Sequence, residues 1–140
     1  MKICGIDPGL NGGIAFIAGD FITADRVPVL NITKGKSTKR FLDAWSIMRM
    51  IDDQAPDHVF IEKQQAMPKQ GLSSTFATGF GYGIYIGLLV AARVSYTERS
   101  ALSNGKRIYK FHLIRMLHEN VPVKYSLLPV NFGNSKEMMG

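Results

Sequence analysis

The stretch Lys2-Ile3-Cys4-Gly5-Ile6-Asp7-Pro8-Gly9 is typical of a buried strand that ends at an acid and then turns sharply. A second short apolar run ends in the same way, in His58-Val59-Phe60-Ile61-Glu62-Lys63. Mg²⁺ is usually held in proteins by one or two carboxylates together with substrate phosphate. If the two strands are neighbours, their terminal acids can share one ion. The sequence therefore predicts a metal site that contains Asp7 and Glu62.

Each of these acids also has an ordinary structural interpretation. An Asp before Pro-Gly can act as the cap that initiates a turn, and this would suffice to explain Asp7. Glu62 can form an exposed ion pair with Lys63 at the end of its strand. The presence of two acids in matching positions favours the metal site over both alternatives.

The pattern along the chain predicts an α/β fold with a mixed five-stranded sheet and helices on both of its faces. The first three strands form an antiparallel meander, and helices and strands alternate after it. Residues 33–40 are expected to be a polar, basic loop that either touches phosphate or is simply solvated. Ser73 or Ser74 is the expected cap of the second helix. The expected strands are 2–6, 13–18, 21–30, 58–62 and 94–98, and the expected helices are about 38–53, 73–93 and 108–119.

Length and charge point to one domain, residues 1–140, that meets a polyanion. The hydrophobic content is 46% and the charged content 20%, as in soluble globular proteins. The formal net charge of +6 is uneven, because residues 63–140 carry ten Lys and Arg but only three Glu. Cations can hold phosphates while carboxylates hold a metal, so nucleic acid is the expected partner. A soluble protein that is merely basic is the alternative.

The sequence also predicts a cytoplasmic protein that does not interact with a membrane. Cys4 is the single cysteine and lies within the first apolar run, which suits a reducing compartment. No export signal opens the chain. The segment 70–92 carries no charge, but its serines, threonines and glycines favour a buried helix over a membrane span.

Two blocks of sequence resemble a known family. Gly5-Ile6-Asp7-Pro8-Gly9 followed by Gly13-Ile14-Ala15 is similar to the opening of RuvC-type Holliday junction resolvases. Phe60-Ile61-Glu62-Lys63-Gln64-Gln65-Ala66-Met67-Pro68-Lys69-Gln70-Gly71, continued by Ser73-Ser74-Thr75-Phe76 and the glycines 79, 81 and 83, resembles the small phage and prophage RuvC-like proteins. The resemblance covers about residues 1–98 and implies an RNase H-like fold.

The resemblance implies a homodimer that binds a Holliday junction or other branched DNA and cuts it by magnesium-dependent hydrolysis, with manganese as an alternative metal. Asp7 matches the metal ligand of the first strand, and Glu62 matches that of the fourth. The loop 63–71 and the start of the following helix would face the junction. Phe76 would stack or wedge near the branch point, unless it packs in the core. The DNA-binding residues implied in this way are Lys63, Lys69, Gln70, Ser73, Ser74 and Phe76.

The later part of the chain departs from the family. RuvC-type resolvases complete their site with a pair of acids on a last helix, whereas the only acids after Lys63 are Glu98, Glu119 and Glu137. Residues 99–140 are therefore divergent, and Glu119 is the substitute third ligand that we would test. Two functions follow: a structure-selective endonuclease, or a catalytically weakened or inactive junction-binding protein on the same fold. A fragment of an actin-like ATPase or sugar kinase, which opens with a similar Gly-x-Asp-x-Gly turn, is a third and less supported reading.

Overall fold

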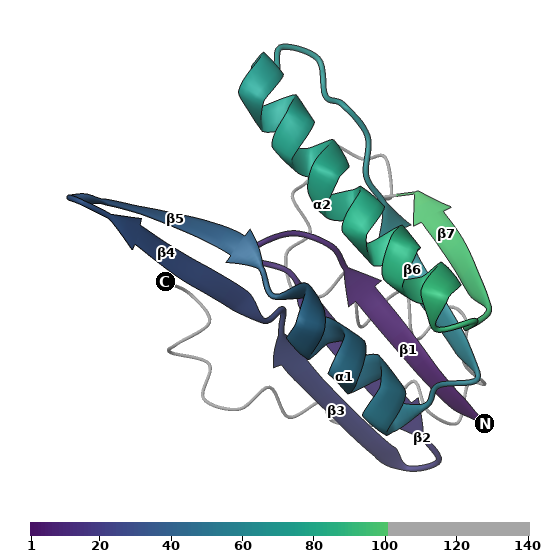
Figure 1. Ribbon diagram of the computed structural model, residues 1–140. Coiled ribbons are helices and arrows are strands. Elements are labelled where there is room, and N and C mark those ends of the chain that lie inside the picture. Colours follow the sequence, from purple (N-terminus) through teal and green to yellow (C-terminus); the bar gives the residue numbers. More distant parts are fainter. Residues whose placement is uncertain (101–140) are drawn as a thin grey trace.

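The structure is a computed structural model and describes residues 1–100. The predicted helix 108–119 and the acids Glu119 and Glu137 lie outside the described residues. The described chain forms a five-stranded sheet, a separate two-stranded hairpin and two helices (Figure 1).

The central sheet is mixed, as the sequence predicted. Its strand order is β3-β2-β1-β6-β7. The meander of β1, β2 and β3 is antiparallel, whereas β6 runs parallel to β1 and β7 runs parallel to β6. The bounds of these strands are β1 Lys2–Asp7, β2 Gly13–Ala18, β3 Phe21–Arg26, β6 His58–Lys63 and β7 Tyr96–Ser100. Strands β1 and β6, which carry Asp7 and Glu62 near their carboxyl ends, are therefore direct neighbours.

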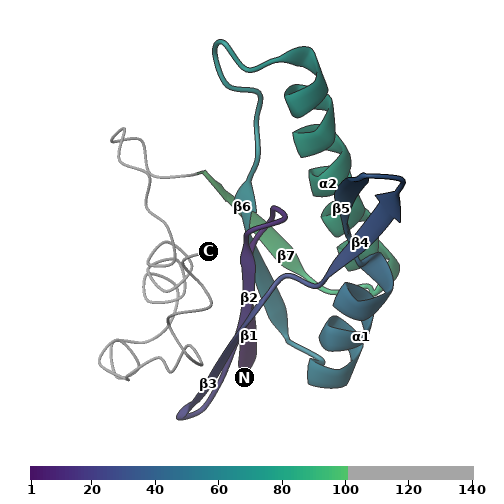
Figure 2. The same cartoon turned by 90° about the vertical axis from the view of Figure 1, so that its left-hand side faces the viewer.

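Both described helices cover the same face of the sheet (Figure 2). Helix α1 (Ala44–Gln54) contributes Ile47 and Ile51 to the core, and helix α2 (Leu72–Ala91) contributes Tyr85 and Leu89. These side chains pack on Cys4, Ile6, Ile14, Phe16, Val59 and Ile61 from the sheet. A smaller cluster on the opposite face is formed by Ile3, Ala15 and Ile17. Within residues 1–100, the predicted helices on both faces are thus found on one face only.

The segment between β3 and α1 differs from the prediction. The third strand ends at Arg26, not at residue 30, and the expected basic loop is a regular hairpin of β4 (Val29–Lys34) and β5 (Ser37–Leu42). Val27 N–H donates to the Gly12 carbonyl and so joins the base of the hairpin to the turn after β1, whereas Asp43 N–H donates to the Pro28 carbonyl and closes the base of the hairpin itself. A glycine turn at Gly35, flanked by segments that contain β-branched residues, is the signal for this hairpin.

The starts of both helices differ from the prediction. Helix α1 starts at Ala44, not near residue 38, because Asp43 caps it by accepting hydrogen bonds from the Ser46 backbone at 3.1 Å and the Ser46 hydroxyl at 2.6 Å. These bonds, that of the hydroxyl first, lower the pKa of Asp43. Helix α2 is capped by Gly71 without a side-chain bond, so the predicted cap at Ser73 or Ser74 is wrong. Strand β7 lies two residues later than expected.

Helix α2 is the longest described element and the most apolar. By length and composition it could cross a membrane, and little of it is buried. Tyr85 and Leu89 nevertheless pack into the core against β1 and β6. One such helix is weak support for a membrane span, since core helices of soluble proteins share these properties. Its exposed apolar side therefore calls for another explanation.

Candidate active site

The register of the central strands brings the two predicted metal ligands together. In the parallel pair of β1 and β6, Ile6 lies opposite Ile61. Asp7 and Glu62 each follow one position later, so they lie side by side on strands that are about 4.8 Å apart. They are not at opposite edges of the sheet, the arrangement that would have excluded a shared ion. Their role as ligands stays a prediction.

Strand alternation determines the face on which these acids lie. Ile6 and Ile61 point into the core beneath α1 and α2. The next residue on each strand points to the other face, so Asp7 and Glu62 are directed away from both described helices. Both acids are half-buried and both make contacts within the protein. The acids thus border the second face at the carboxyl ends of β1 and β6.

A tightly packed turn follows Asp7. Gly12 N–H donates to the Gly9 carbonyl, which folds residues 8–12 back over the end of β1. A Cβ atom on Gly12 would overlap the Asp7 carbonyl oxygen, whereas one on Gly9 would meet nothing within 4 Å. Only glycine fits at position 12 with this backbone. The turn therefore holds the backbone of Asp7 in place.

Arg40 attaches the β4–β5 hairpin to the same turn. Its guanidinium donates to Asn11 Oδ1 and to the Leu10 carbonyl, each at 2.8 Å. Sequence reasoning treated Arg40 only as part of a basic loop. Successive side chains of a strand point to opposite faces, so recognising residues 37–42 as a strand would have placed Arg40 and Lys39 on different faces.

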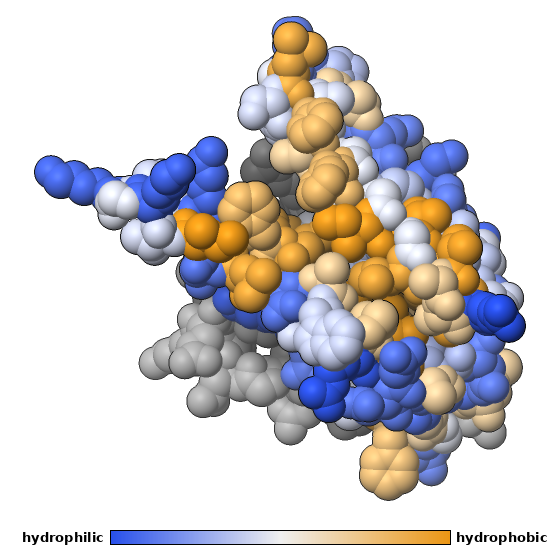
Figure 3. Space-filling view, viewed as in Figure 1, coloured by the Kyte–Doolittle hydropathy of each residue, from blue (hydrophilic) through white to orange (hydrophobic). Residues whose placement is uncertain are grey.

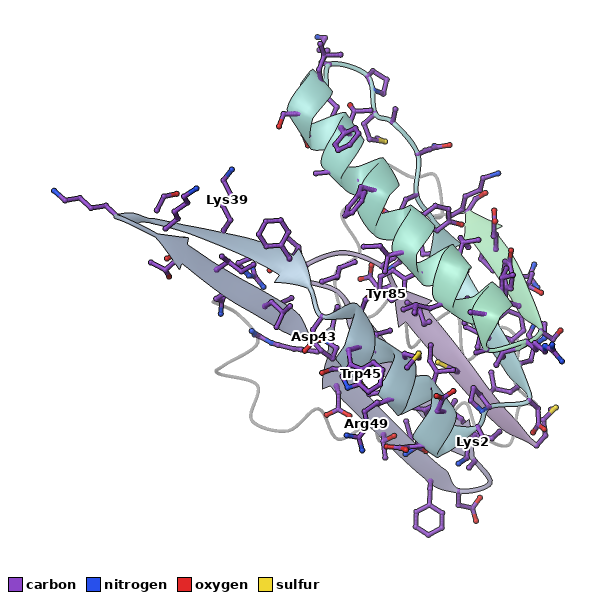
Figure 4. All side chains as sticks on the ribbon, in the orientation of Figure 1. Lys2, Lys39, Asp43, Trp45, Arg49 and Tyr85 are labelled. Atoms are coloured by element: carbon purple, nitrogen blue, oxygen red, sulfur yellow. The ribbon has the colours of Figure 1, made fainter. Side chains whose placement is uncertain are left out.

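Tyr85 is a further residue near Asp7 that the sequence analysis missed. Its side chain is fully buried in the core, and its hydroxyl has no hydrogen-bond partner among the described residues. Burial, and then the negative charge of Asp7, raise the pKa of Tyr85. Figure 4 shows Tyr85 on α2, over the carboxyl end of β1. A tyrosine within an apolar helix looked like ordinary core, and its proximity to the charge of Asp7 becomes visible only in the folded structure.

Glu98 belongs to a different environment from Glu62. It lies opposite Ile61 across β6 and β7, which places it on the helix-covered face. There its carboxylate lies 3.9 Å from Lys63 Nζ. Burial first, and then the charge of Glu98, raise the pKa of Tyr82 to about 12. Lys63, which we expected at DNA, is therefore half-exposed beside Glu98, and an exposed pair of this kind adds little stability.

Arg99 is the cation nearest in register to Glu62. The two residues are direct partners across β6 and β7. The Arg99 guanidinium carbon lies 5.7 Å from the centre of the Phe60 ring, on the face to which Glu62 points. A cation at this place can meet a phosphate that approaches the two acids. No sequence motif points to Arg99, because its place beside Glu62 depends on strand pairing.

The predicted DNA-binding loop is organised by Gln70. Its Nε2 donates to the Ser74 hydroxyl at 2.9 Å and to the Thr78 hydroxyl at 3.2 Å, and its Oε1 accepts from Met67 N–H at 3.0 Å. Gln70 therefore fastens the loop to the first turns of α2. Lys69 is exposed in this loop with a positive φ of 64°, and Ser73 is exposed in the first turn of the helix.

Phe76 does not pack in the core. It is 75% exposed, and its ring stacks on that of Phe80 with centroids 6.2 Å apart. The core-packing alternative for Phe76 is therefore wrong. Exposed aromatic rings on the first half of α2 are able to stack on bases or to pack on another protein.

The donor set fits a hard divalent cation. Asp7 and Glu62 supply oxygen ligands, which Mg²⁺ and Mn²⁺ prefer. Among residues 1–100, no group of three or more His, Cys, Asp or Glu side chains could hold a metal. The described chain therefore offers two carboxylates, and the predicted third ligand, Glu119, lies outside it.

Comparison with known proteins agrees with this geometry. No protein-family model and no curated protein sequence matches the chain. Among solved structures, Thermus thermophilus RuvC bound to a Holliday junction matches with a TM-score of 0.52 and 13% identity, over 94% of this chain and 84% of that chain. A second structure of Thermus thermophilus RuvC matches with a TM-score of 0.50 and 15% identity, over 99% of this chain and 88% of that chain. The five-stranded mixed sheet with its helices is thus a RuvC-like fold of the RNase H-like type.

Proposed function

We propose that this protein is a magnesium-dependent endonuclease that acts on Holliday junctions or other branched DNA. The observation that carries the proposal is the adjacency of Asp7 and Glu62 at the carboxyl ends of two parallel strands in a RuvC-like sheet. The basic charge of the chain is consistent with a nucleic-acid substrate. A single buried thiol, that of Cys4, is consistent with a reducing cytoplasm.

Asp7 and Glu62 would hold the metal, with Mn²⁺ as a substitute for Mg²⁺. The bound ion would supply activation of water and charge neutralisation at the scissile phosphate. The turn at residues 8–12 keeps Asp7 in position for this role. Arg99 and Lys69 would attract the DNA backbone toward the acids, and exposed Phe76 would stack at the branch point.

A second function is supported by the composition of the site itself. Residues 1–100 supply two carboxylates to the site, and two alone are a weak set for a two-metal centre. A junction-binding protein with reduced or no cleavage activity would keep the fold and the cations. The two functions make different predictions for the unmodified protein in Mg²⁺ or Mn²⁺.

A homodimer is part of the proposal, and helix α2 is the surface we assign to it. Glycines 79, 83 and 87 lie one helical turn apart, and a Cβ on any of them would meet nothing within 4 Å. This side of the helix is apolar and includes the exposed Phe80, as the orange area of Figure 3 shows. A second copy of α2 can approach closely along the glycines. Gly83→Leu should then shift sedimentation toward the monomer.

The decisive experiment compares the unmodified protein with Asp7→Asn on a labelled four-way junction. The nuclease proposal predicts nicking in Mg²⁺ that Asp7→Asn abolishes, while junction binding stays equal or becomes tighter because a negative charge is lost. Binding without nicking by the unmodified protein, in either metal, would establish the binding-protein alternative. Equal affinity for the junction and for linear duplex would overturn both.

A further inference from the structure

The β4–β5 hairpin is a basic projection that the proposed site does not use. Residues 29–42 carry Lys34, Lys36, Lys39 and Arg40 and no acid. Every residue from 30 to 41 is exposed. In Figures 1 and 2 the hairpin extends away from the sheet, on the side that bears the helices. A projection whose charged side chains are all cationic is expected to attract a polyanion.

The hairpin register places Arg40 and the lysines on different faces. Arg40 lies opposite Asn31, on the face that also carries the bonded hydroxyls of Thr33 and Thr38. Lys39 lies opposite Ile32, and Lys34 shares its face by strand alternation. Lys36 is at the tip, next to Gly35, whose φ of 63° suits glycine. Arg40 therefore faces the body, and the lysines occupy the other face and the tip.

Arg40 anchors this projection to the turn that follows Asp7. Its two bonds to Asn11 and to the Leu10 carbonyl join the hairpin to the chain next to the proposed metal ligand. The three lysines, by contrast, make no ion pair or hydrogen bond with any described residue. Figure 4 shows Lys39 extended from β5 into solvent. The hairpin thus has one fastened cation and three that are available.

We propose that the β4–β5 hairpin binds the phosphate backbone of one duplex arm of the substrate, through Lys34, Lys36 and Lys39. The inference rests on the proposed function and extends it from the branch point to the arm. Lys36 lies four residues from Arg40, which is about 13 Å along a strand. The contact should therefore fall about four base pairs from the DNA that meets the turn at residues 8–12.

Charge distribution favours DNA over a second copy of the chain as the occupant. The exposed apolar residues Leu30 and Phe41 face each other near the base of the hairpin, whereas the outer half is lysine-rich. In Figure 3 the outer half of the hairpin is hydrophilic, whereas apolar side chains gather near its base and over α2. Two copies paired through their outer halves would bring like charges together.

The test compares two variants of equal charge, each lacking two cations. Lys34→Gln/Lys39→Gln removes hairpin lysines, and Arg49→Gln/Arg93→Gln removes exposed cations from α1 and from the end of α2. Affinity for a four-way junction and for a linear duplex is measured in EDTA over a range of salt. Hydroxyl-radical footprints are recorded on the junction.

The hairpin variant should bind both DNAs about tenfold or more weakly near 0.1 M salt, and its plot of log K against log salt should flatten by about 0.9 for each lost phosphate contact. It should also lose backbone protection about four base pairs out along one arm. The Arg49/Arg93 variant should retain the slope and the footprint. Equal slopes and footprints for the two variants, or an altered oligomeric state in the hairpin variant alone, would overturn the inference while leaving the proposed function standing. An unmodified protein that binds no DNA would overturn both.

Discussion

The hydroxyl of Tyr85 is buried near the carboxyl end of β1 without a hydrogen-bond partner among the described residues, and burial, followed by the charge of Asp7, raises its pKa. A buried hydroxyl without a partner is destabilising, because it has left water and gained no bond. The ring itself fills the core between α2 and the sheet. The ring and the hydroxyl of Tyr85 therefore act on stability in opposite directions.

Tyr85→Phe should leave the free energy of unfolding unchanged or raise it by about 1 kcal/mol, since it removes only the unbonded hydroxyl. Tyr85→Ala should lower it by about 3–5 kcal/mol through loss of the buried ring. Urea denaturation followed by circular dichroism measures both changes. If Tyr85→Phe proved destabilising by more than about 1 kcal/mol, the hydroxyl would have a partner in solution.

Gly12→Ala should destabilise the protein by about 1–3 kcal/mol, because its Cβ would meet the Asp7 carbonyl oxygen and the backbone must shift. Gly9→Ala is the matched control in the same turn, where a Cβ has open space. It should leave the melting temperature nearly unchanged. Equal melting temperatures for the two variants would show that the turn after Asp7 is not tightly packed.

The Cys4 thiol should resist modification while the protein is folded. Burial raises its pKa, so the folded state holds the protonated, unreactive form well above the ordinary pKa of a thiol. Because the folded-state pKa is the higher one, the thiol does not oppose folding at neutral pH. The free energy of unfolding should fall as the pH rises from the ordinary pKa of a thiol toward the folded-state pKa. An aromatic disulfide reagent at about pH 8 should react slowly without urea and rapidly in it. Rapid labelling of the folded protein would place Cys4 outside the core.

Much of the fold was predictable because its signals are local. The apolar runs that end at Asp7 and Glu62 specified β1 and β6, and the parallel pairing of these strands made the acids neighbours. The β4–β5 hairpin was missed because lysines at 34, 36 and 39 resemble a solvated loop. The start of α1 was placed too early because Phe41 and Leu42, which belong to β5, continue the apolar spacing of the helix. Arg99 was not predictable, since its place opposite Glu62 exists only once β7 pairs with β6.

The last prediction concerns which acids bind metal. Glu62 points to the face shared with Asp7, whereas Glu98 points to the helix-covered face beside Lys63. Glu62→Gln should therefore weaken Mn²⁺ binding about tenfold or more, as expected for the loss of one of two carboxylate ligands. Glu98→Gln removes the same charge from an adjacent strand and should change the affinity little. Isothermal titration with Mn²⁺ alone measures both variants.

Glu119→Gln extends this comparison to the proposed third ligand. If Glu119 completes the site, its substitution should weaken Mn²⁺ binding as Glu62→Gln does, and it should slow nicking of a four-way junction where the unmodified protein nicks it. If neither quantity changes, another group or none completes the site. Equal losses of Mn²⁺ affinity for Glu62→Gln and Glu98→Gln would contradict the assignment of Glu62 itself. The effect would then follow net charge and not the geometry of the strand ends.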